Sequence, residues 1–332
     1  MEIPVQLKQS TYSIIIERGC LDRLHQYISL QRKVYIISDD GIPTTYAQQV
    51  KKQCKYGFIH IVPQGEKSKS LDVYQEIIQE LLKLRFSRKD LIVTIGGGMV
   101  SDLGGFVAAT YMRGIDFVNI PTTTLAQIDA SIGGKVAVNI GNLKNIIGAF
   151  YQPKLVCIDP DTLQTLPKRH YVNGIVEAIK AGLLCDPSLF KLIQHGDIFQ
   201  DYETILQKAI LVKKNIVEKD EKEAGLRTIL NFGHTLGHAL ESCYELQDVL
   251  HGECVAIGML AFTHDPILKK QLCTLYEALG LATSLPYHIE DVYNKIVNDK
   301  KTDAEYINIV ELSTIGIYEI KNIKIEAIKQ YL

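Results

Sequence analysis

Residues 91–105 read Leu-Ile-Val-Thr-Ile-Gly-Gly-Gly-Met-Val-Ser-Asp-Leu-Gly-Gly, a short apolar run that passes directly into glycines. The run Leu91–Ile95 is rich in β-branched residues, which predicts a buried strand. The glycines let the backbone approach a ligand and leave bare N–H groups at a helix start, where phosphate binds well. Because Ser101 breaks the G-x-G-x-x-G pattern and no P-loop Gly-Lys-Ser/Thr follows, a tight strand-to-helix turn explains the loop equally well.

Similar apolar runs lie on both sides of this stretch. They predict three further buried strands, over 34–38, 58–62 and 117–120. A helical pattern fills residues 71–84, and its predicted buried face consists of Leu71, Tyr74, Ile78, Leu81 and Leu82. Strands and helices that alternate at this spacing predict a parallel α/β sheet, and ligands of such sheets bind at the carboxyl ends of the strands.

The second half of the chain is different in character. From about Tyr171 the helical period dominates, and the next clear strand pattern is Tyr306–Val310. We therefore predict an α/β nucleotide-binding domain with a parallel sheet over residues 1–160. A mainly α-helical metal- and substrate-binding domain is predicted over residues 161–332.

Composition excludes several classes of protein. The 332 residues are 46% hydrophobic with a net charge of −2, which argues against a nucleic-acid binder. The sequence has no run of 18 apolar residues, so we predict no membrane span, and the N-terminus lacks a signal-peptide pattern. The seven cysteines are scattered and odd in number, as free thiols in a reducing compartment would be. We expect a cytoplasmic protein.

A histidine-rich segment, Asn231-Phe-Gly-His-Thr-Leu-Gly-His238, suggests a metal. Its histidines, His234 and His238, are separated by about 40° around a helix axis, so both face one side. His251 follows closely, and Glu177 precedes Lys180 by three residues. Histidine and glutamate are the ligands of open catalytic zinc sites. A histidine pair or a helical glutamate alone is weak support, so the hypothesis depends on their convergence.

Several cations and hydroxyls accompany these motifs. Pro121–Thr124 and Gln64–Lys69 each follow a predicted strand and bring polar groups to the sheet edge. A lone lysine or arginine is usually a solvated surface group. Here many of them flank glycine- or amide-rich motifs, which suggests a polyanionic substrate with carboxylate and phosphate groups.

Taken together, the motifs resemble the 3-dehydroquinate synthase family over residues 34–301. The segments that carry the resemblance are residues 96–114, 121–135, 177–180, 225–227, 231–241 and 251–253. The resemblance implies a lyase of the shikimate pathway that uses NAD and a divalent metal, zinc or cobalt. It would convert 3-deoxy-D-arabino-heptulosonate 7-phosphate to 3-dehydroquinate and phosphate. The implied steps are oxidation at C5, phosphate elimination, re-reduction, ring opening and an aldol closure.

The resemblance also implies a role for individual residues. The metal ligands would be Glu177, His234 and His251. NAD would contact Asp39, Glu66, Lys69, Gly97, Gly98, Met99, Val100, Ser101, Asp102, Thr122, Thr123, Lys135, Lys144, Thr162, Leu163, Gln164 and Thr165. Substrate and catalytic contacts would come from Asp129, Lys135, Lys144, Asn145, Lys180, Lys213, Arg227, Asn231, His238 and Lys300 or Lys301. Arg113 would reach the site of a neighbouring subunit, which implies a homodimer. His238 is the candidate relay for the C5 hydroxyl proton.

Two features depart from the family pattern. The segment after Met259 is shorter than usual, and His170 stands where an acidic residue is common. The alternatives are a sibling cyclase, of the amino-dehydroquinate or deoxy-inosose synthase type, a metal-dependent polyol dehydrogenase, and a non-catalytic protein that binds NAD or metal. Lys213 with Arg227 favours a carboxylated substrate over the siblings.

Overall fold

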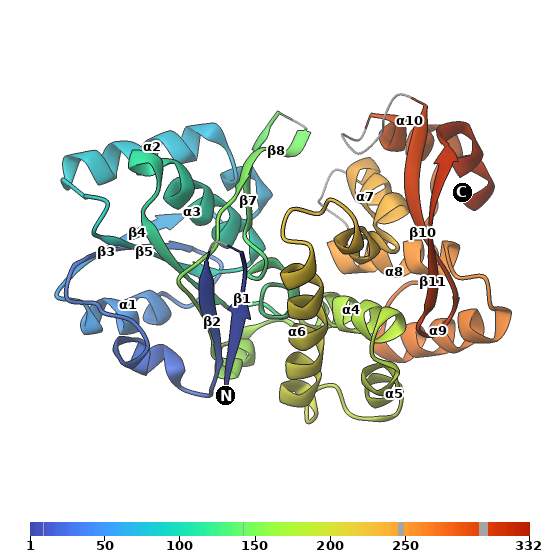
Figure 1. Ribbon diagram of the computed structural model, residues 1–332, viewed down its shortest axis with the longest axis horizontal. Helices are drawn as coiled ribbons and strands as arrows, with labels where there is room; N and C mark the ends of the chain where they lie inside the picture. The colour runs from blue at the N-terminus through green and yellow to red at the C-terminus, as the bar shows by residue number, and fades with distance from the viewer. Residues whose placement is uncertain (9, 142, 245–248, 299–304) are drawn as a thin grey trace. The chain divides into compact units, whose positions relative to one another are not determined.

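The computed structural model describes residues 1–332 apart from residues 9, 142, 245–248 and 299–304 (Figure 1). The chain divides into two compact units, Met1–Pro167 and Lys168–Leu332. The first unit is built around a sheet, and the second is mostly helical. The predicted fold class, an α/β domain followed by a helical one, is confirmed.

The first unit contains a seven-stranded sheet with the strand order β1-β2-β9-β6-β5-β3-β4. β1 pairs antiparallel with β2, and the other neighbouring pairs are parallel. The strands are β1 (Glu2–Gln6), β2 (Thr11–Ile16), β3 (Lys33–Asp39), β4 (Tyr56–Val62), β5 (Leu91–Gly96), β6 (Asp116–Pro121) and β9 (Leu155–Ile158). The four strands predicted from apolar runs are β3 to β6, and each is one or two residues longer than predicted.

Apolar cores cover both faces of this sheet. Along β3, Tyr35 and Ile37 face a core shared with α2 and α3, whereas Val34 and Ile36 face a core shared with α1. These helices are α1 (Thr44–Gln53), α2 (Leu71–Lys83) and α3 (Gly98–Thr110). A strand buried on both faces is apolar along its whole length, which is why the sequence identified these strands so clearly.

The buried face predicted for the helix over 71–84 is partly wrong. Leu81 is fully buried, but Leu71 and Leu82 are 40% and 56% exposed. Ile77 enters the core instead, one turn before Leu81. Neighbouring residues lie about 100° apart around a helix, so Leu81 and Leu82 cannot share one face. Leu71 is the first helical residue, next to Ser70, whose hydroxyl caps the helix by accepting the Val73 N–H.

A hairpin that the sequence analysis did not predict packs against α3. It consists of β7 (Lys135–Ile140) and β8 (Leu143–Phe150), paired antiparallel. Gly105 of α3 permits the close approach, because a Cβ there would lie 2.3 Å from Val136 Cγ1. The hairpin carries three predicted site residues, Lys135, Lys144 and Asn145.

The second unit surrounds one buried helix. All residues of α4 from Tyr171 to Leu184 are buried, and α5, α6 and α8 pack against it. The helices are α4 (Lys168–Leu184), α5 (Pro187–His195), α6 (Tyr202–Lys219), α7 (His234–Cys243), α8 (His251–Ala261), α9 (Pro266–Leu279) and α10 (Ile289–Val297). A two-stranded sheet, β10 (Tyr306–Thr314) with β11 (Ile317–Lys324), and the short η7 (Ile325–Tyr331) complete it. No helix in the described parts of the chain is long and apolar enough to cross a membrane.

The short segment after Met259 is tied into the fold. α8 ends at Ala261, and α9 begins at Pro266 behind a cap from Asp265. Backbone hydrogen bonds join Phe262 and His264 to Leu312 of β10, at 2.9 Å each. The connection between α8 and α9 is therefore held by backbone hydrogen bonds to β10.

Glu311 of β10 connects three parts of the second unit. Its side chain is 4% exposed, and it accepts hydrogen bonds from Lys321 of β11 at 2.6 Å and from the Tyr331 hydroxyl. His264 Nε2 lies 2.8 Å away. Burial opposes the charged carboxylate, but these partners outweigh it and lower the pKa of Glu311 below its usual 4.5.

We expect Glu311→Gln to destabilise the protein in a pH-dependent manner. A lowered folded-state pKa contributes stability above the unfolded pKa, and that contribution is lost as the pH falls through the folded pKa. The stability gap between wild type and variant should therefore be largest above about pH 5 and shrink towards pH 3. Urea unfolding from pH 3 to pH 8 measures the gap. A gap that stays constant with pH would contradict this role of the Glu311 charge.

Candidate functional site

The predicted cofactor residues follow neighbouring strands of the sheet. Asp39 is the last residue of β3, and the segments that follow the other strands contain Thr162, Thr122, Gly97 and Glu66, after β9, β6, β5 and β4. In the sheet these strands are adjacent in the order β9, β6, β5, β3 and β4. Because these strands are parallel, their carboxyl ends lie along one edge (Figure 1). This is the edge where ligands of parallel α/β sheets bind.

The glycine loop is packed closely against its neighbours on this edge. A Cβ on Gly96 would lie 3.1 Å from Asp39 Oδ2, and one on Gly97 would lie 3.2 Å from Thr123 Cγ2. α3 begins at Gly98 with no side-chain cap, so its first N–H groups are open to an anion. Val100 is fully buried in the core, which leaves only its backbone for a ligand.

Other groups on this edge also suit a nucleotide. Among the described residues, the buried Thr122 and Thr124 hydroxyls have no hydrogen-bond partner. Thr162 differs, because its hydroxyl donates to the Asp159 carbonyl at 2.7 Å. Burial raises the pKa of the Asp39 carboxyl, and the Gly41 N–H opposes that shift.

A buried polar network supports the loop after β4. Lys69 Nζ donates to Asp102 Oδ2 at 2.5 Å and lies 3.6 Å from Glu66 Oε1. Burial lowers the pKa of Lys69, but the two carboxylates outweigh it and raise the pKa overall, so the ammonium stays charged. Asn139 Nδ2 donates to Glu66 at 2.8 Å, and its Oδ1 accepts from the Asn145 N–H at 2.8 Å. The sequence analysis missed Asn139, since an asparagine late in a strand carries no distinctive pattern.

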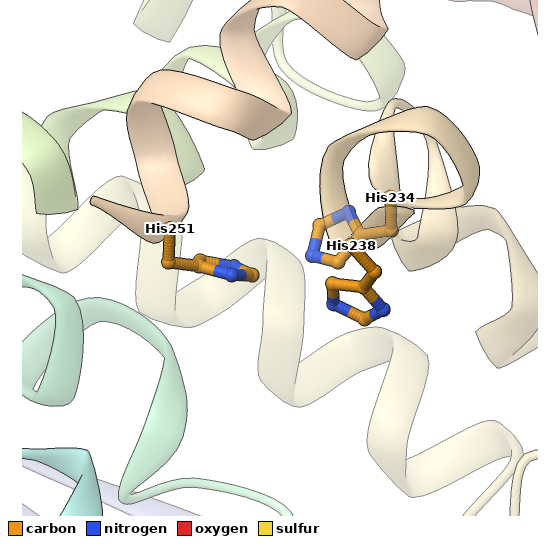
Figure 2. A group of neighbouring side chains, drawn as sticks. All are labelled: His234, His238 and His251. Carbon is orange, nitrogen blue, oxygen red and sulfur yellow. The ribbon is translucent and has the colours of Figure 1, made fainter. Parts of the chain in front are cut away.

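In the second unit, three histidines converge (Figure 2). His234 and His238 come from the first two turns of α7, and His251 is the first residue of α8. One ring nitrogen from each lies within 4.8 Å of the others, so this group could hold a metal ion. The pairing of His234 with His238 on one helix face agrees with the prediction.

Glu177 of α4 completes this cluster from another side. Its carboxylate is 2% exposed, and Oε1 lies 3.6 Å from His234 Nε2 and 3.8 Å from His251 Nε2. Lys180 Nζ lies 2.5 Å from Oε2, although neither oxygen accepts a well-directed hydrogen bond from the described residues. Tetrahedral ligands at about 2.0–2.2 Å from zinc stand roughly 3.4 Å apart. The spacing and the unsatisfied carboxylate therefore fit a divalent metal.

Hydrogen bonds at Nδ1 orient two of the histidines. His234 Nδ1 lies 3.1 Å from the Phe232 carbonyl, and His251 Nδ1 lies 3.3 Å from Glu241 Oε2. Both partners only accept, so Nδ1 carries the proton and Nε2 presents its lone pair. Burial lowers the pKa of His251, but Glu241 and Glu177 outweigh it and raise the pKa.

Glycines set the distances between the three helices that carry this cluster. A Cβ on Gly258 of α8 would lie 1.9 Å from the Gly233 carbonyl oxygen, just before α7. A Cβ on Gly252 would lie 2.1 Å from the carbonyl of Asn173 in α4, whose Oδ1 also accepts the Gly252 N–H at 2.5 Å. Only glycine permits backbones to approach this closely. The glycine in His251-Gly-Glu253 therefore lets α8 pack against the helix of Glu177.

Three cations in this unit are buried, although such residues are usually exposed. Lys180, Lys213 and Arg227 are 3%, 7% and 2% exposed. Lys180 donates to the Leu230 carbonyl at 2.7 Å, and Arg227 donates to the Glu221 carbonyl at 2.7 Å. Asn231 Nδ2 donates to Glu223 at 2.9 Å. Lys180 adjoins the histidine cluster through Glu177, whereas Arg227 and Asn231 form hydrogen bonds with the segment 220–223.

The remaining predicted residues are more dispersed. Lys135 is exposed at the start of β7, and Asp129 lies half-buried in the short η4 (Ala126–Ala130). Arg113 is exposed in η3 (Tyr111–Arg113), and His170 is exposed in the first turn of α4. Lys300 and Lys301 lie outside the described residues.

Comparisons with known proteins agree with this arrangement. Residues 59–173 match the model of the 3-dehydroquinate synthase N-terminal family, and residues 174–302 match that of the C-terminal family. The chain is 39% identical to a 3-dehydroquinate synthase of Clostridium acetobutylicum, over 99% of this chain and 98% of the relative. It is 40% identical to one of Microcystis aeruginosa, over 95% and 92% of the two chains.

Solved structures share the fold. A 2-deoxy-scyllo-inosose synthase complexed with carbaglucose-6-phosphate, NAD+ and Co2+ matches with a TM-score of 0.89 and 23% identity, over 99% of this chain and 98% of that one. A 2-epi-5-epi-valiolone synthase from Streptomyces hygroscopicus with NAD+ and Zn2+ matches with a TM-score of 0.89 and 24% identity, over 98% and 97%. A probable glycerol dehydrogenase from Sinorhizobium meliloti is more distant, with a TM-score of 0.63 and 16% identity over 96% and 94%.

Proposed function

The chain belongs to the 3-dehydroquinate synthase family, and from that membership we propose that Glu177, His234 and His251 hold a divalent metal ion. The enzyme converts 3-deoxy-D-arabino-heptulosonate 7-phosphate to 3-dehydroquinate and phosphate. The observation that carries the metal proposal is the buried Glu177 carboxylate, which faces Nε2 of both histidines within 3.8 Å. The bound Co2+ and Zn2+ of the structural relatives support a divalent metal, zinc or cobalt.

His238 is the alternative third ligand, since its ring also belongs to the histidine cluster. We favour Glu177 because its carboxylate oxygens lack hydrogen-bond partners in the described structure. The Lys180 ammonium compensates the charge of this buried carboxylate, and a metal ion would bind the oxygens that accept no directed hydrogen bond. His238 is then assigned to take the C5 hydroxyl proton from the substrate.

NAD is proposed to bind along the carboxyl ends of β9, β6, β5, β3 and β4. The uncapped start of α3 suits the pyrophosphate, and the Thr122 hydroxyl is available to donate to a polar group. The Lys69 ammonium adds a buried positive charge beside Asp102 and Glu66. The bound NAD+ of the structural relatives supports this proposal.

The buried cations of the second unit are proposed to hold the substrate's anionic groups. Lys213 and Arg227 are assigned to the carboxylate, which the substrate of a deoxy-inosose synthase would lack. Buried ammonium and guanidinium groups form strong charge-assisted hydrogen bonds with a carboxylate or a phosphate. Fixing both ends of the substrate keeps its reacting carbons aligned through the successive steps.

Each group then has one chemical task. When held by Glu177, His234 and His251, a divalent metal would polarise the C5 oxygen, and bound NAD would supply the hydride chemistry at C5. His238 takes the hydroxyl proton as C5 is oxidised. The ketone acidifies the neighbouring C–H, and the cations hold the phosphate where its own oxygen can remove that proton. The enzyme therefore supplies position and charge more than acid–base groups.

A homodimer is part of the same proposal. Arg113 is exposed, and both it and Met112 have positive φ angles, 65° and 49°. Such backbone conformations cost about 1–3 kcal/mol each, which supports a role for this segment beyond folding. Analytical ultracentrifugation should give a mass twice that of the 37.2 kDa chain. We expect Arg113→Ala to lower the activity and to leave the dimer intact. This result would fit a contact between Arg113 and the site of the neighbouring subunit.

The turnover assay follows phosphate and NADH together, with NAD, zinc or cobalt and the heptulosonate phosphate. We expect phosphate to be released continuously without accumulation of NADH, because the hydride returns in each cycle. A chelator should stop release, and added metal should restore it. NADH that accumulates without phosphate would indicate a polyol dehydrogenase. Turnover only with a carboxylate-free sugar phosphate would indicate a sibling cyclase.

A further inference from the structure

Glu241 lies beside the proposed metal site but has no role in the proposed function. It follows His238 by three residues and His234 by seven, so all three lie on one face of α7. Its side chain is 13% exposed, and Oε2 lies 3.3 Å from His251 Nδ1. The contact joins α7 to the first residue of α8.

The position of Glu241 on its helix is unfavourable for a carboxylate. α7 ends at Cys243, so Glu241 lies in the last turn, where the helix dipole disfavours negative charge. The His251 ring lies between two carboxylates, because it contacts Glu241 through Nδ1 and faces Glu177 through Nε2. The contact with His251 offsets part of this cost, because the Nδ1–H group donates to the carboxylate.

We propose that Glu241 is a positioning residue that orients His251 for metal binding; this rests on the proposed metal site. The carboxylate accepts the Nδ1 proton, which fixes the tautomer and turns the Nε2 lone pair towards Glu177. His234 is oriented differently, because its Nδ1 partner is the Phe232 backbone carbonyl at 3.1 Å. The Glu241 side chain can be removed by mutation, whereas the Phe232 carbonyl cannot.

Cobalt binding to the metal-free full-length protein tests this assignment. Co2+ affinity is measured by chelator competition, and the visible spectrum of bound Co2+ reports its coordination. Glu241→Ala should raise the Kd for Co2+ about 10- to 100-fold, as loss of an outer-shell partner does elsewhere. Glu241→Gln should raise it less, because the amide oxygen still accepts the Nδ1 proton. The exposed Glu277 of α9 provides the control Glu277→Gln, which should bind Co2+ like wild type.

Thermal unfolding of the metal-free variants separates positioning from a structural role. Positioning predicts an unchanged or higher metal-free Tm for Glu241→Ala together with weaker Co2+ binding. The positioning role would be overturned in favour of a structural role if Glu241→Ala lowers the metal-free Tm as well as the Co2+ affinity and Glu241→Gln restores neither. Wild-type Co2+ affinity in Glu241→Ala would also overturn it. If His234→Ala binds Co2+ as tightly as wild type, the proposed metal site itself fails.

Discussion

Glu177→Gln should remove stably bound metal and lower turnover at least about 1000-fold. A metal acting as a Lewis acid contributes several kcal/mol to the transition state, and each 1.36 kcal/mol is a factor of ten in rate. The amide keeps the shape of the side chain but loses the charge that faces His234 Nε2 and His251 Nε2. Metal content after gel filtration and steady-state phosphate release measure the two effects.

Glu277→Gln is the matched control, because it removes a carboxylate from an exposed position in the same unit. It should retain both metal and turnover. The Glu177 variant should also remain folded, as shown by an unchanged far-ultraviolet circular dichroism spectrum. Retention of wild-type metal content by Glu177→Gln, with turnover within tenfold of wild type, would contradict the ligand role of this carboxylate.

Lys180→Met should destabilise the metal-free enzyme by about 3–5 kcal/mol, as loss of one partner of a buried ion pair does. Lys180 and Glu177 are 3% and 2% exposed, and their charged atoms lie 2.5 Å apart. Without the ammonium, the carboxylate remains buried with no opposite charge. A bound metal supplies that charge, so the loss in stability should be smaller with zinc than with a chelator.

Urea unfolding of four proteins measures this coupling: wild type, each single variant and Glu177→Gln/Lys180→Met. The double variant should be more stable than Lys180→Met when metal is absent, since neither partner is then left charged and alone. A Lys180→Met loss that is equal with and without zinc would mean that the metal does not compensate the Glu177 charge.

The sequence predicted the sheet best where burial is complete. The runs of β3 and β5 are apolar on both faces, so they stand out from their surroundings. β9 is as fully buried, but the sequence analysis did not predict it. β8 exposes alternate residues, and its partner β7 is defined by packing on α3, which the sequence does not reveal.

For the metal cluster, the sequence predicted only local relations. The spacing of His234 and His238 fixes a shared helix face, and the spacing of Glu177 and Lys180 fixes their contact. The approach of His251 to Glu177 depends on the glycine contacts between α4, α7 and α8, which are tertiary. The resemblance supplied the ligand set, and the structure adds the Nε2 orientation. The hydrogen bond to Glu241 could not be predicted, because the acceptor of a histidine Nδ1 is set by packing.

The most direct test of the account is the position of the metal in crystals of the cobalt- or zinc-loaded enzyme, located by anomalous diffraction. We predict one peak bonded to Glu177, His234 Nε2 and His251 Nε2, at about 2.0–2.2 Å from each ligand atom. Both ring nitrogens of His238 should lie too far from the metal to bond to it. A metal bonded to His234, His238 and His251, with the Glu177 carboxylate turned away towards Lys180, would contradict it.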